Sequence, residues 1–243
     1  MLELLSEVKG SHRATELFYY DLEERLMENT KAVNKIASPK ISKSLEKIFI
    51  DGAIEDKESF SSGIVEDCII ENQNAEHIAF NEVIFRNVTF KDITFNCIDL
   101  TDVRFENCDL SNGDLSGAVI HRAEFINCKI VGVNLSESTI KNALFEECNG
   151  RYSSFRFSDC KQVNFKNCLM NNSDYQRCSL LKVAFNDCNL QQVEMSGTSL
   201  KGIDFTSCEI DGIGARVEDL KGVIVSSHQT VTLAELIGVV VKL

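Results

Sequence analysis

A five-residue period runs through most of this chain and constrains its fold more than any other feature. From Phe80 onward a large apolar residue occupies nearly every fifth position, and a small or β-branched residue lies two positions before it. A period of five matches neither the ~3.6 residues of an α-helical turn nor the two-residue alternation of a plain strand. The backbone must therefore change direction every five residues.

A second period of twenty residues lies on the first. Phenylalanine and cysteine recur with it, at Phe85, Phe105, Phe125, Phe145, Phe165, Phe185 and Phe205 and at Cys108, Cys128, Cys148, Cys168, Cys188 and Cys208. Four five-residue sides then make one coil, and successive coils stack at a strand spacing of about 4.8 Å. The sequence predicts an all-β solenoid of about eight coils over positions 65–225, with both apolar positions of each side pointing inward. Gly150 and Cys160 underfill two large positions, so we expect irregular packing there, with Phe155 taking part of the space.

Composition excludes several classes of protein. The chain has 25 basic and 37 acidic residues, and this excess of acid disfavours direct nucleic-acid binding through phosphates. No apolar run approaches the roughly 18 residues of a membrane helix, and the N-terminus lacks the pattern of a secretory signal. We therefore expect a cytoplasmic protein without a membrane contact, whose ten cysteines are reduced thiols.

The sequence contains no catalytic constellation. Its four histidines are scattered, and it has no glycine-rich phosphate loop, HExxH or CxxC motif. The cysteine column points inward in parallel, which suits a small apolar side chain better than a tetrahedral zinc site. We expect neither an enzyme nor a bound cofactor or metal.

Surface charge is the remaining functional signal, and it is uneven. Outward positions beside the Phe and Cys columns are mainly acidic: Glu106, Asp109, Glu124, Glu146, Glu147, Asp187, Asp204 and Glu209. An adjacent edge carries Arg122, Lys141, Lys161, Lys182, Lys201 and Lys221. From charge alone, a solvated acidic surface and a partner-binding surface are both open interpretations.

After Val225 the period stops and helical signals begin. Ser226 and Gln229 have capping-box spacing, Val231 and Leu233 begin an apolar face, and Gly238 is a C-terminal stop signal. The predicted domains are an N-terminal extension over 1–38, the repeats over 39–225, and a helix with an apolar tail over 226–243. The extension has one short amphipathic helical face, and a translation start at Met27 is an open alternative that would make the first 26 residues an upstream addition.

The five-residue pattern resembles the pentapeptide repeat proteins, which form a right-handed quadrilateral β-helix. The stretches 121–157, 199–207 and 220–241 are similar to the Qnr type of Gram-positive bacteria, which protects topoisomerases from quinolones. The resemblance covers about 39–243. Some Qnr proteins carry loops that project from the helix, whereas here the register is unbroken from 65 to 225, so a mechanism that needs such loops is not implied.

The resemblance implies a DNA mimic that binds DNA gyrase and/or topoisomerase IV through the acidic positions named above. It also implies a homodimer made by the C-terminal helix and tail, with contact candidates Leu233, Leu236, Ile237, Val239, Val240 and Val241. A monomer whose tail caps the last coil is the alternative. The alternative functions are a non-catalytic binding scaffold for another partner and a self-resistance protein against another topoisomerase toxin.

Overall fold

The computed structural model describes residues 36–50, 52–236 and 238–240. The chain divides into two compact units, 1–35 and 36–243, and every described residue belongs to the second unit. The predicted N-terminal extension over 1–38 thus lies almost wholly outside the described residues. No helix in the described part of the chain is long and apolar enough to cross a bilayer.

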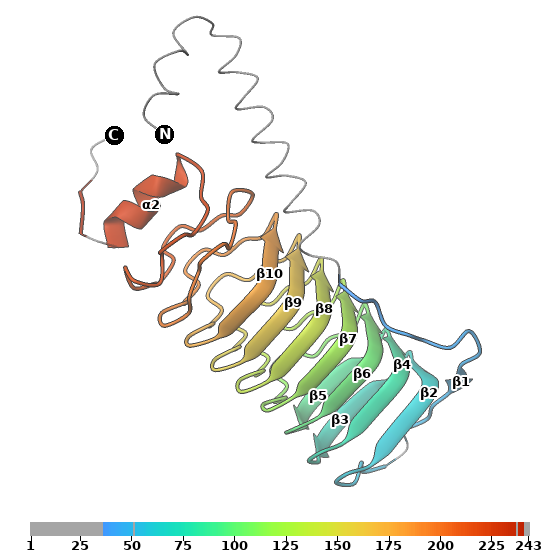
Figure 1. Ribbon diagram of the computed structural model, residues 1–243. Helices are drawn as coiled ribbons and strands as arrows, with labels where there is room; N and C mark the ends of the chain where they lie inside the picture. Colours follow the sequence, from blue (N-terminus) through green and yellow to red (C-terminus); the bar gives the residue numbers. More distant parts are fainter. Residues whose placement is uncertain (1–35, 51, 237, 241–243) are drawn as a thin grey trace, which may run out of the picture. The chain divides into compact units, whose positions relative to one another are not determined.

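The described chain is a stack of parallel β-strands joined by tight corners (Figure 1). The main sheet has eight strands in the order β1-β2-β4-β6-β7-β8-β9-β10, and β3 pairs with β5 in a second sheet. The strands are β1 (Glu46–Lys47), β2 (Ser59–Glu66), β3 (Ile69–Asn74), β4 (Ala79–Arg86), β5 (Thr89–Thr94), β6 (Asp99–Glu106), β7 (Val119–Ile126), β8 (Thr139–Glu146), β9 (Asp159–Lys166) and β10 (Ser179–Asn186). The element after them is a short helix, α2 (Gln229–Leu236).

The strand register confirms the predicted all-β solenoid. From β2 onward, paired residues lie twenty positions apart, as in Phe105↔Phe125 and Phe125↔Phe145. Strands β2, β4 and β6 to β10 mark about seven turns of the coil. Beyond β10 the coil continues through isolated bridges such as Asn189↔Glu209 and Asp204↔Ile224, without a strand of its own. The later part of the eight predicted coils is therefore built from turns.

The corners explain how the backbone turns every five residues. The second residue after nearly every large apolar position has a positive φ, for example +55° at Asn107 and +51° at Asn127. Asparagine tolerates this left-handed conformation better than most residues. Along one corner the amides also join successive coils, because Asn127 Nδ2 donates to Asn107 Oδ1 at 2.8 Å. Four such corners per coil give the solenoid four sides.

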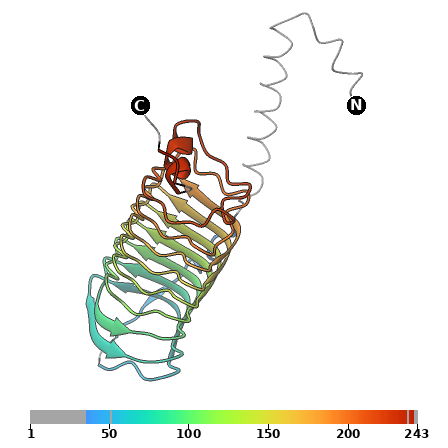
Figure 2. The ribbon, with the colours of Figure 1, turned by 90° about the vertical axis from the view of Figure 1, so that its left-hand side faces the viewer.

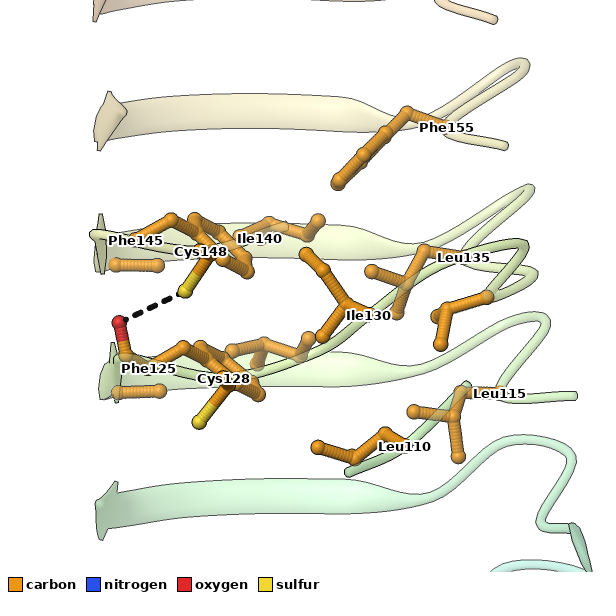
Figure 3. Packing of buried hydrophobic residues seen from close by; sticks show 14 of the residues in the cluster. Leu110, Leu115, Phe125, Cys128, Ile130, Leu135, Ile140, Phe145, Cys148 and Phe155 are labelled. Atoms are coloured by element: carbon orange, nitrogen blue, oxygen red, sulfur yellow. Dashed lines mark hydrogen bonds between the residues drawn. The ribbon is translucent and has the colours of Figure 1, made fainter. Parts of the chain in front are cut away.

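Stacked phenylalanines form the centre of the core (Figure 3). Their ring centroids are 4.7 Å apart for Phe105–Phe125 and for Phe125–Phe145, with nearly parallel planes. Phe145 and Phe165 are 0% and 1% exposed, as the period predicts. The irregular position at Gly150 is filled mainly by the next coil, since a Cβ there would lie 2.5 Å from Met170 Sδ. Phe155, the expected filler, occupies its own regular position and packs against Phe145 and Phe165.

The cysteine column is buried, as predicted, and it also contributes hydrogen bonds. All ten cysteines are free, and the six at twenty-residue spacing are buried. Each of several thiols donates to the carbonyl of a phenylalanine in the preceding coil, as Cys148 Sγ does to Phe125 O at 3.3 Å (Figure 3). Cys178, in another column, donates likewise to Phe155 O. Burial raises the pKa of the Cys178 thiol to about 11, which keeps it protonated at neutral pH.

An extended segment, residues 36–50, precedes the first full coil, and we call it the N-terminal strap (Figure 1). Its backbone amides bind side chains of distant coils: Ala37 N donates to Asn142 Oδ1 at 3.3 Å and Lys40 N donates to Asp102 Oδ1 at 2.8 Å. At its other end β1 pairs with β2, and Ile48 N donates to Ile64 O. The strap therefore runs past several coils before the chain enters the solenoid.

Helix α2 covers the last coil (Figure 2). The predicted capping box is confirmed, because Ser226 N donates to Gln229 Oε1 at 2.8 Å and Gln229 N donates to Ser226 Oγ at 3.3 Å. The predicted stop is confirmed too: Gly238 has φ +77° and its amide donates to Glu235 O. Gln229 Nε2 also donates to two carbonyls of the coil beneath, Phe205 O and Cys208 O. The helix start thus satisfies backbone groups at the end of the stack.

Candidate partner-binding surfaces

The acidic residues named from the sequence occupy two adjoining sides of the solenoid. Glu106, Glu124 and Glu146 lie on β6, β7 and β8, while Asp109 and Glu209 lie on the next side, in isolated bridges. Across the described residues, no group of three or more His, Cys, Asp or Glu side chains is arranged to hold a metal ion. The side chains on these sides offer charge and hydrogen bonding.

Half of the acidic set is paired with cations of neighbouring coils. Arg104 Nη2 lies 2.7 Å from Glu124 Oε2, and Arg86 Nε lies 2.8 Å from Glu106 Oε2. Glu124 is only 9% exposed beneath the Arg104 guanidinium. Because the two charges of each pair neutralise one another, Glu106 and Glu124 present little net charge to a partner.

Glu146 and Asp109 are paired in the same way. Lys166 Nζ contacts Glu146 Oε1, and Lys129 Nζ lies 3.4 Å from Asp109 Oδ2. Burial by itself would raise the pKa of Asp109, but hydrogen bonds from Ser111 and the charge of Lys129 hold that pKa below its usual value. The sequence contained a signal for these pairs, because each joins opposite charges twenty positions apart.

Four acidic residues keep an unneutralised charge: Glu147, Asp187, Asp204 and Glu209. In the described part of the chain no Lys or Arg nitrogen lies within ion-pair distance of them, although the field of Lys166 reaches Glu147 and Asp187. Asp204 accepts hydrogen bonds from Thr206, and Glu209 accepts one from Asn189 Nδ2. We call these four residues the open acidic surface.

A buried ion pair on another corner was not singled out from the sequence. Arg122 Nε and Nη2 each lie 2.5 Å from an oxygen of Asp102, which also accepts the amide of Lys40 in the strap. Asp102 is 5% exposed. Burial would raise the pKa of Asp102, but the hydrogen bonds of Arg122 and Lys40 lower it overall. Burial, with Arg122 and Lys141 nearby, lowers the pKa of His121.

The predicted dimer residues are divided between the core and the surface. Leu233 and Leu236 are partly buried and pack against the end of the core. Val239 and Val240 are 46% and 85% exposed. Ile237 and Val241 lie outside the described residues. Within this chain the helix therefore caps the last coil, while Val239 and Val240 after it are open to solvent.

The geometry defines a parallel β-solenoid whose coils are four five-residue sides. The sequence profile described as pentapeptide repeat region matches residues 98–175 and 158–226, which together are more than half of the chain. The chain belongs to the pentapeptide repeat family. A search of curated proteins found no match.

Several solved structures are similar to this chain. A trypsin-treated variant of QnrB1, a plasmid-mediated fluoroquinolone resistance protein, aligns with 76% of this chain and 99% of its own at 19% identity and a TM-score of 0.41. HetL of the cyanobacterium Nostoc sp. strain PCC 7120, involved in heterocyst differentiation regulation, aligns with 66% of this chain and 87% of its own at 8% identity and a TM-score of 0.36. A pentapeptide repeat protein of the Arabidopsis thaliana thylakoid lumen covers 57% of this chain and 75% of its own at 18% identity and a TM-score of 0.31.

Proposed function

We propose that this chain is a Qnr-type protein that binds DNA gyrase and/or topoisomerase IV and protects it from quinolones. It would act in the cytoplasm as a non-catalytic DNA mimic, and its coil would be right-handed. The resemblance of the stretches 121–157, 199–207 and 220–241 to the Gram-positive Qnr type supports this proposal. The observation that carries it is the open acidic surface, where four carboxylates have no ion-pair partner among the described residues.

Charge density limits how the mimicry works. Duplex DNA carries one negative charge per ~1.7 Å of its axis. Glu147 and Asp187 belong to the same corner two coils apart, so their spacing is about 10 Å. A basic groove that accepts DNA would therefore meet fewer charges here than on DNA. Binding must then depend on the shape of the solenoid together with a few well-positioned carboxylates.

The direct test removes these charges and measures gyrase protection. The variant Glu147→Gln/Asp187→Asn/Asp204→Asn/Glu209→Gln keeps side-chain shape and breaks none of the ion pairs described. We expect its affinity for gyrase at low salt to fall roughly tenfold or more, and its salt dependence to become shallower. Supercoiling in ciprofloxacin should no longer be rescued, while the melting temperature stays within about 2 °C of wild type.

A matched control removes four charges from the other edge. Lys141, Lys161, Lys201 and Lys221 lie in one column of twenty-residue steps, in which Leu181 occupies the middle position, and their replacement by Gln should leave gyrase binding and protection nearly unchanged. Full protection by the acidic variant would show that the open acidic surface is not the contact. If the wild-type protein does not bind gyrase or topoisomerase IV, the scaffold or self-resistance alternatives become the better hypotheses.

We further propose that the protein is a homodimer joined through its C-terminal tail. Val239 and Val240 are exposed apolar residues next to a helix that already uses Leu233 and Leu236 inside its own chain. A strip of exposed valines favours association with a second copy across a two-fold axis.

A further inference from the structure

Two neighbouring corners of one coil carry exposed aromatic side chains. Tyr152 is 63% exposed and Phe157 is 47% exposed, and their φ angles are +59° and +58°. Among the described residues they are the only Phe or Tyr at a left-handed position. Bulky side chains are uncommon in this conformation because Cβ crowds the backbone.

The coil itself does not require aromatic residues at these corners. The positions one coil before and one coil after Tyr152 are Gly132 and Asn172, and both have a positive φ. Asn112 occupies the same corner two coils earlier. Strained residues persist where something other than the local fold favours them, and they cluster at functional sites. The solenoid would accept Asn at this corner with less strain, so the fold does not explain the aromatic choice.

Arginines surround the two aromatic residues. The guanidinium carbons of Arg156 and Arg177 lie 5.5 and 5.8 Å from the centroid of the Phe157 ring, within cation–π range. Arg151 precedes Tyr152 in the chain, and its Nε donates to Asn171 Oδ1 at 3.2 Å. We call Arg151, Tyr152, Arg156, Phe157 and Arg177 the arginine–aromatic surface.

The carboxylates near this surface do not neutralise it. Asp174 lies 3.4 Å from Arg156, and Glu137 occupies the Phe157 corner one coil earlier. In the described part of the chain Arg151 and Arg177 have no carboxylate within ion-pair distance. The chain as a whole carries a net charge of −12, so three arginines against two carboxylates reverse its charge locally.

This composition fits a protein partner. Tyr, Phe and Arg are enriched at the cores of protein interfaces and among the residues that dominate binding energy. A guanidinium that already contacts a ring keeps donors free for carboxylates. The complementary chemistry is an acidic polypeptide segment with an exposed apolar side chain. A nucleic acid would be repelled by the acidic remainder of the chain.

We propose that the arginine–aromatic surface is a second docking surface, and that it holds an acidic segment of the topoisomerase. The inference rests on the proposed function and adds a contact to it. The corners at Tyr152 and Phe157 bound the side formed by residues 153–156, which is opposite the side formed by residues 143–146. The corner that carries Glu147 and the corner that carries Tyr152 bound one side, formed by residues 148–151, so the partner would contact acidic residues at one edge of that side and arginines and aromatic rings at and beyond its other edge.

The test is the double variant Tyr152→Asn/Phe157→Asn, measured in the full chain against the intact gyrase holoenzyme. Asn suits the left-handed corner, so we expect a melting temperature equal to wild type or up to about 4 °C higher. The affinity for gyrase should nevertheless fall roughly tenfold or more. Leu181→Asn is the control, because Leu181 is 50% exposed on another part of the coil, and it should bind as wild type does.

A second variant, Arg151→Gln/Arg177→Gln, retains both rings and tests the charges alone. It should weaken gyrase binding at low salt and make it less sensitive to salt. If the Asn double variant unfolds, the Arg151→Gln/Arg177→Gln variant becomes the deciding test. An affinity for gyrase equal to that of wild type would then overturn the inference.

The outcomes separate this inference from the proposed function. If wild type binds gyrase and the stable Asn double variant binds within about twofold of it, the second docking surface is wrong and the proposed function stands. If wild type does not bind gyrase at all, the proposed function fails and this inference fails with it. Loss of binding in the two variants, with the Leu181 control intact, supports the second surface.

Discussion

One buried hydroxyl lies unpaired in a core that is otherwise largely apolar. Tyr175 is 0% exposed, and its ring stacks on Phe155 with centroids 4.7 Å apart. Its Oη has no hydrogen-bond partner among the described residues, and burial raises the pKa of the phenol well above its ordinary value. An unsatisfied buried donor costs about 1–3 kcal/mol. The buried position therefore accommodates the aromatic ring, while the hydroxyl adds no stabilising contact.

Removing that hydroxyl should stabilise the protein. Tyr175→Phe keeps the stacked ring and deletes the unpaired group, so the free energy of unfolding should rise by about 1 kcal/mol. Urea denaturation at pH 7 measures this change. Phe155→Tyr at the neighbouring ring is the converse control and should lower stability. A destabilised Tyr175→Phe variant would mean that the hydroxyl has a bound water or another partner in solution.

Inward-facing residues were predicted from the sequence, whereas the pairings between outward-facing residues were not, although their twenty-residue spacing was a signal for them. The buried phenylalanines and cysteines follow from the period because a coil has only two inward positions on each side. The burial of Glu124 beneath Arg104 depends on which rotamer a long side chain adopts across coils. The filling of the Gly150 space by Met170 is similar, since a flexible thioether adapts to a neighbour's missing side chain.

Among the elements, the N-terminal strap is attached by polar contacts near its start and by strand pairing and the packing of Ile48 and Ile50 near its end. Most of its residues are exposed, and Asp102 joins it to the solenoid through the Lys40 amide. The sequence did not predict the strap because it lacks the five-residue period, and nothing in its composition specifies which corner it follows. Its attachment at Lys40 depends on the Asp102 carboxylate.

The strap should loosen in acid. The pKa of folded Asp102 is lowered, so its contribution to stability is present above the unfolded value of about 3.9 and is lost as the pH falls through the folded pKa. The pKa of folded His121 is also lowered, so its neutral form adds stability that is lost as the pH falls below about 6.5. Both changes reduce the free energy of unfolding in acid.

Hydrogen exchange can detect this attachment residue by residue. In Asp102→Ala the Lys40 amide loses its acceptor and should exchange faster at neutral pH, with stability reduced by about 1–3 kcal/mol. The Ile48 amide, which is bonded to Ile64 O, is the internal control and should exchange at the wild-type rate. Unchanged protection of Lys40 would contradict the role given to Asp102.

Helix α2 was predicted closely because its ends carry strong local signals. The capping box and the Gly238 stop depend on residues within a few positions of each other. The contacts of Gln229 Nε2 with the last coil join residues more than twenty positions apart, and no local signal indicates them. The dimer depends on a surface outside the chain and stays a prediction.

A substitution at Val240 in the tail can test the dimer without disturbing the fold. Val240 is 85% exposed, so Val240→Asp should change the melting temperature of a monomer by less than about 2 °C. If the tail joins two copies, a charge there should shift the mass measured by light scattering from dimer to monomer. Val119→Asp, at a 44% exposed strand position, should leave the mass unchanged. A dimer that persists in Val240→Asp would move the interface elsewhere.

For the whole molecule, the total charge describes the surface poorly. The net charge of −12 suggests a uniformly acidic body, yet ion pairs neutralise part of one side, and arginines dominate part of the opposite side. Under the proposed function, gyrase binding should depend on the open acidic surface and the arginine–aromatic surface more than on the overall excess of acid. The class of fold was readable from the period, while the distribution of charge required the relative positions of successive coils.

The unbroken twenty-residue register has a consequence for how such a chain changes length. Within the solenoid each coil contacts only its two neighbours, so an in-frame duplication or deletion of one twenty-residue unit beyond the coils that bind the strap would leave every remaining type of contact between coils intact. Such an event would lengthen or shorten the stack by one step of about 4.8 Å. Any insertion that is not a multiple of five would instead put side chains of the inner positions into water. The length of the solenoid can therefore change during evolution only by whole coils.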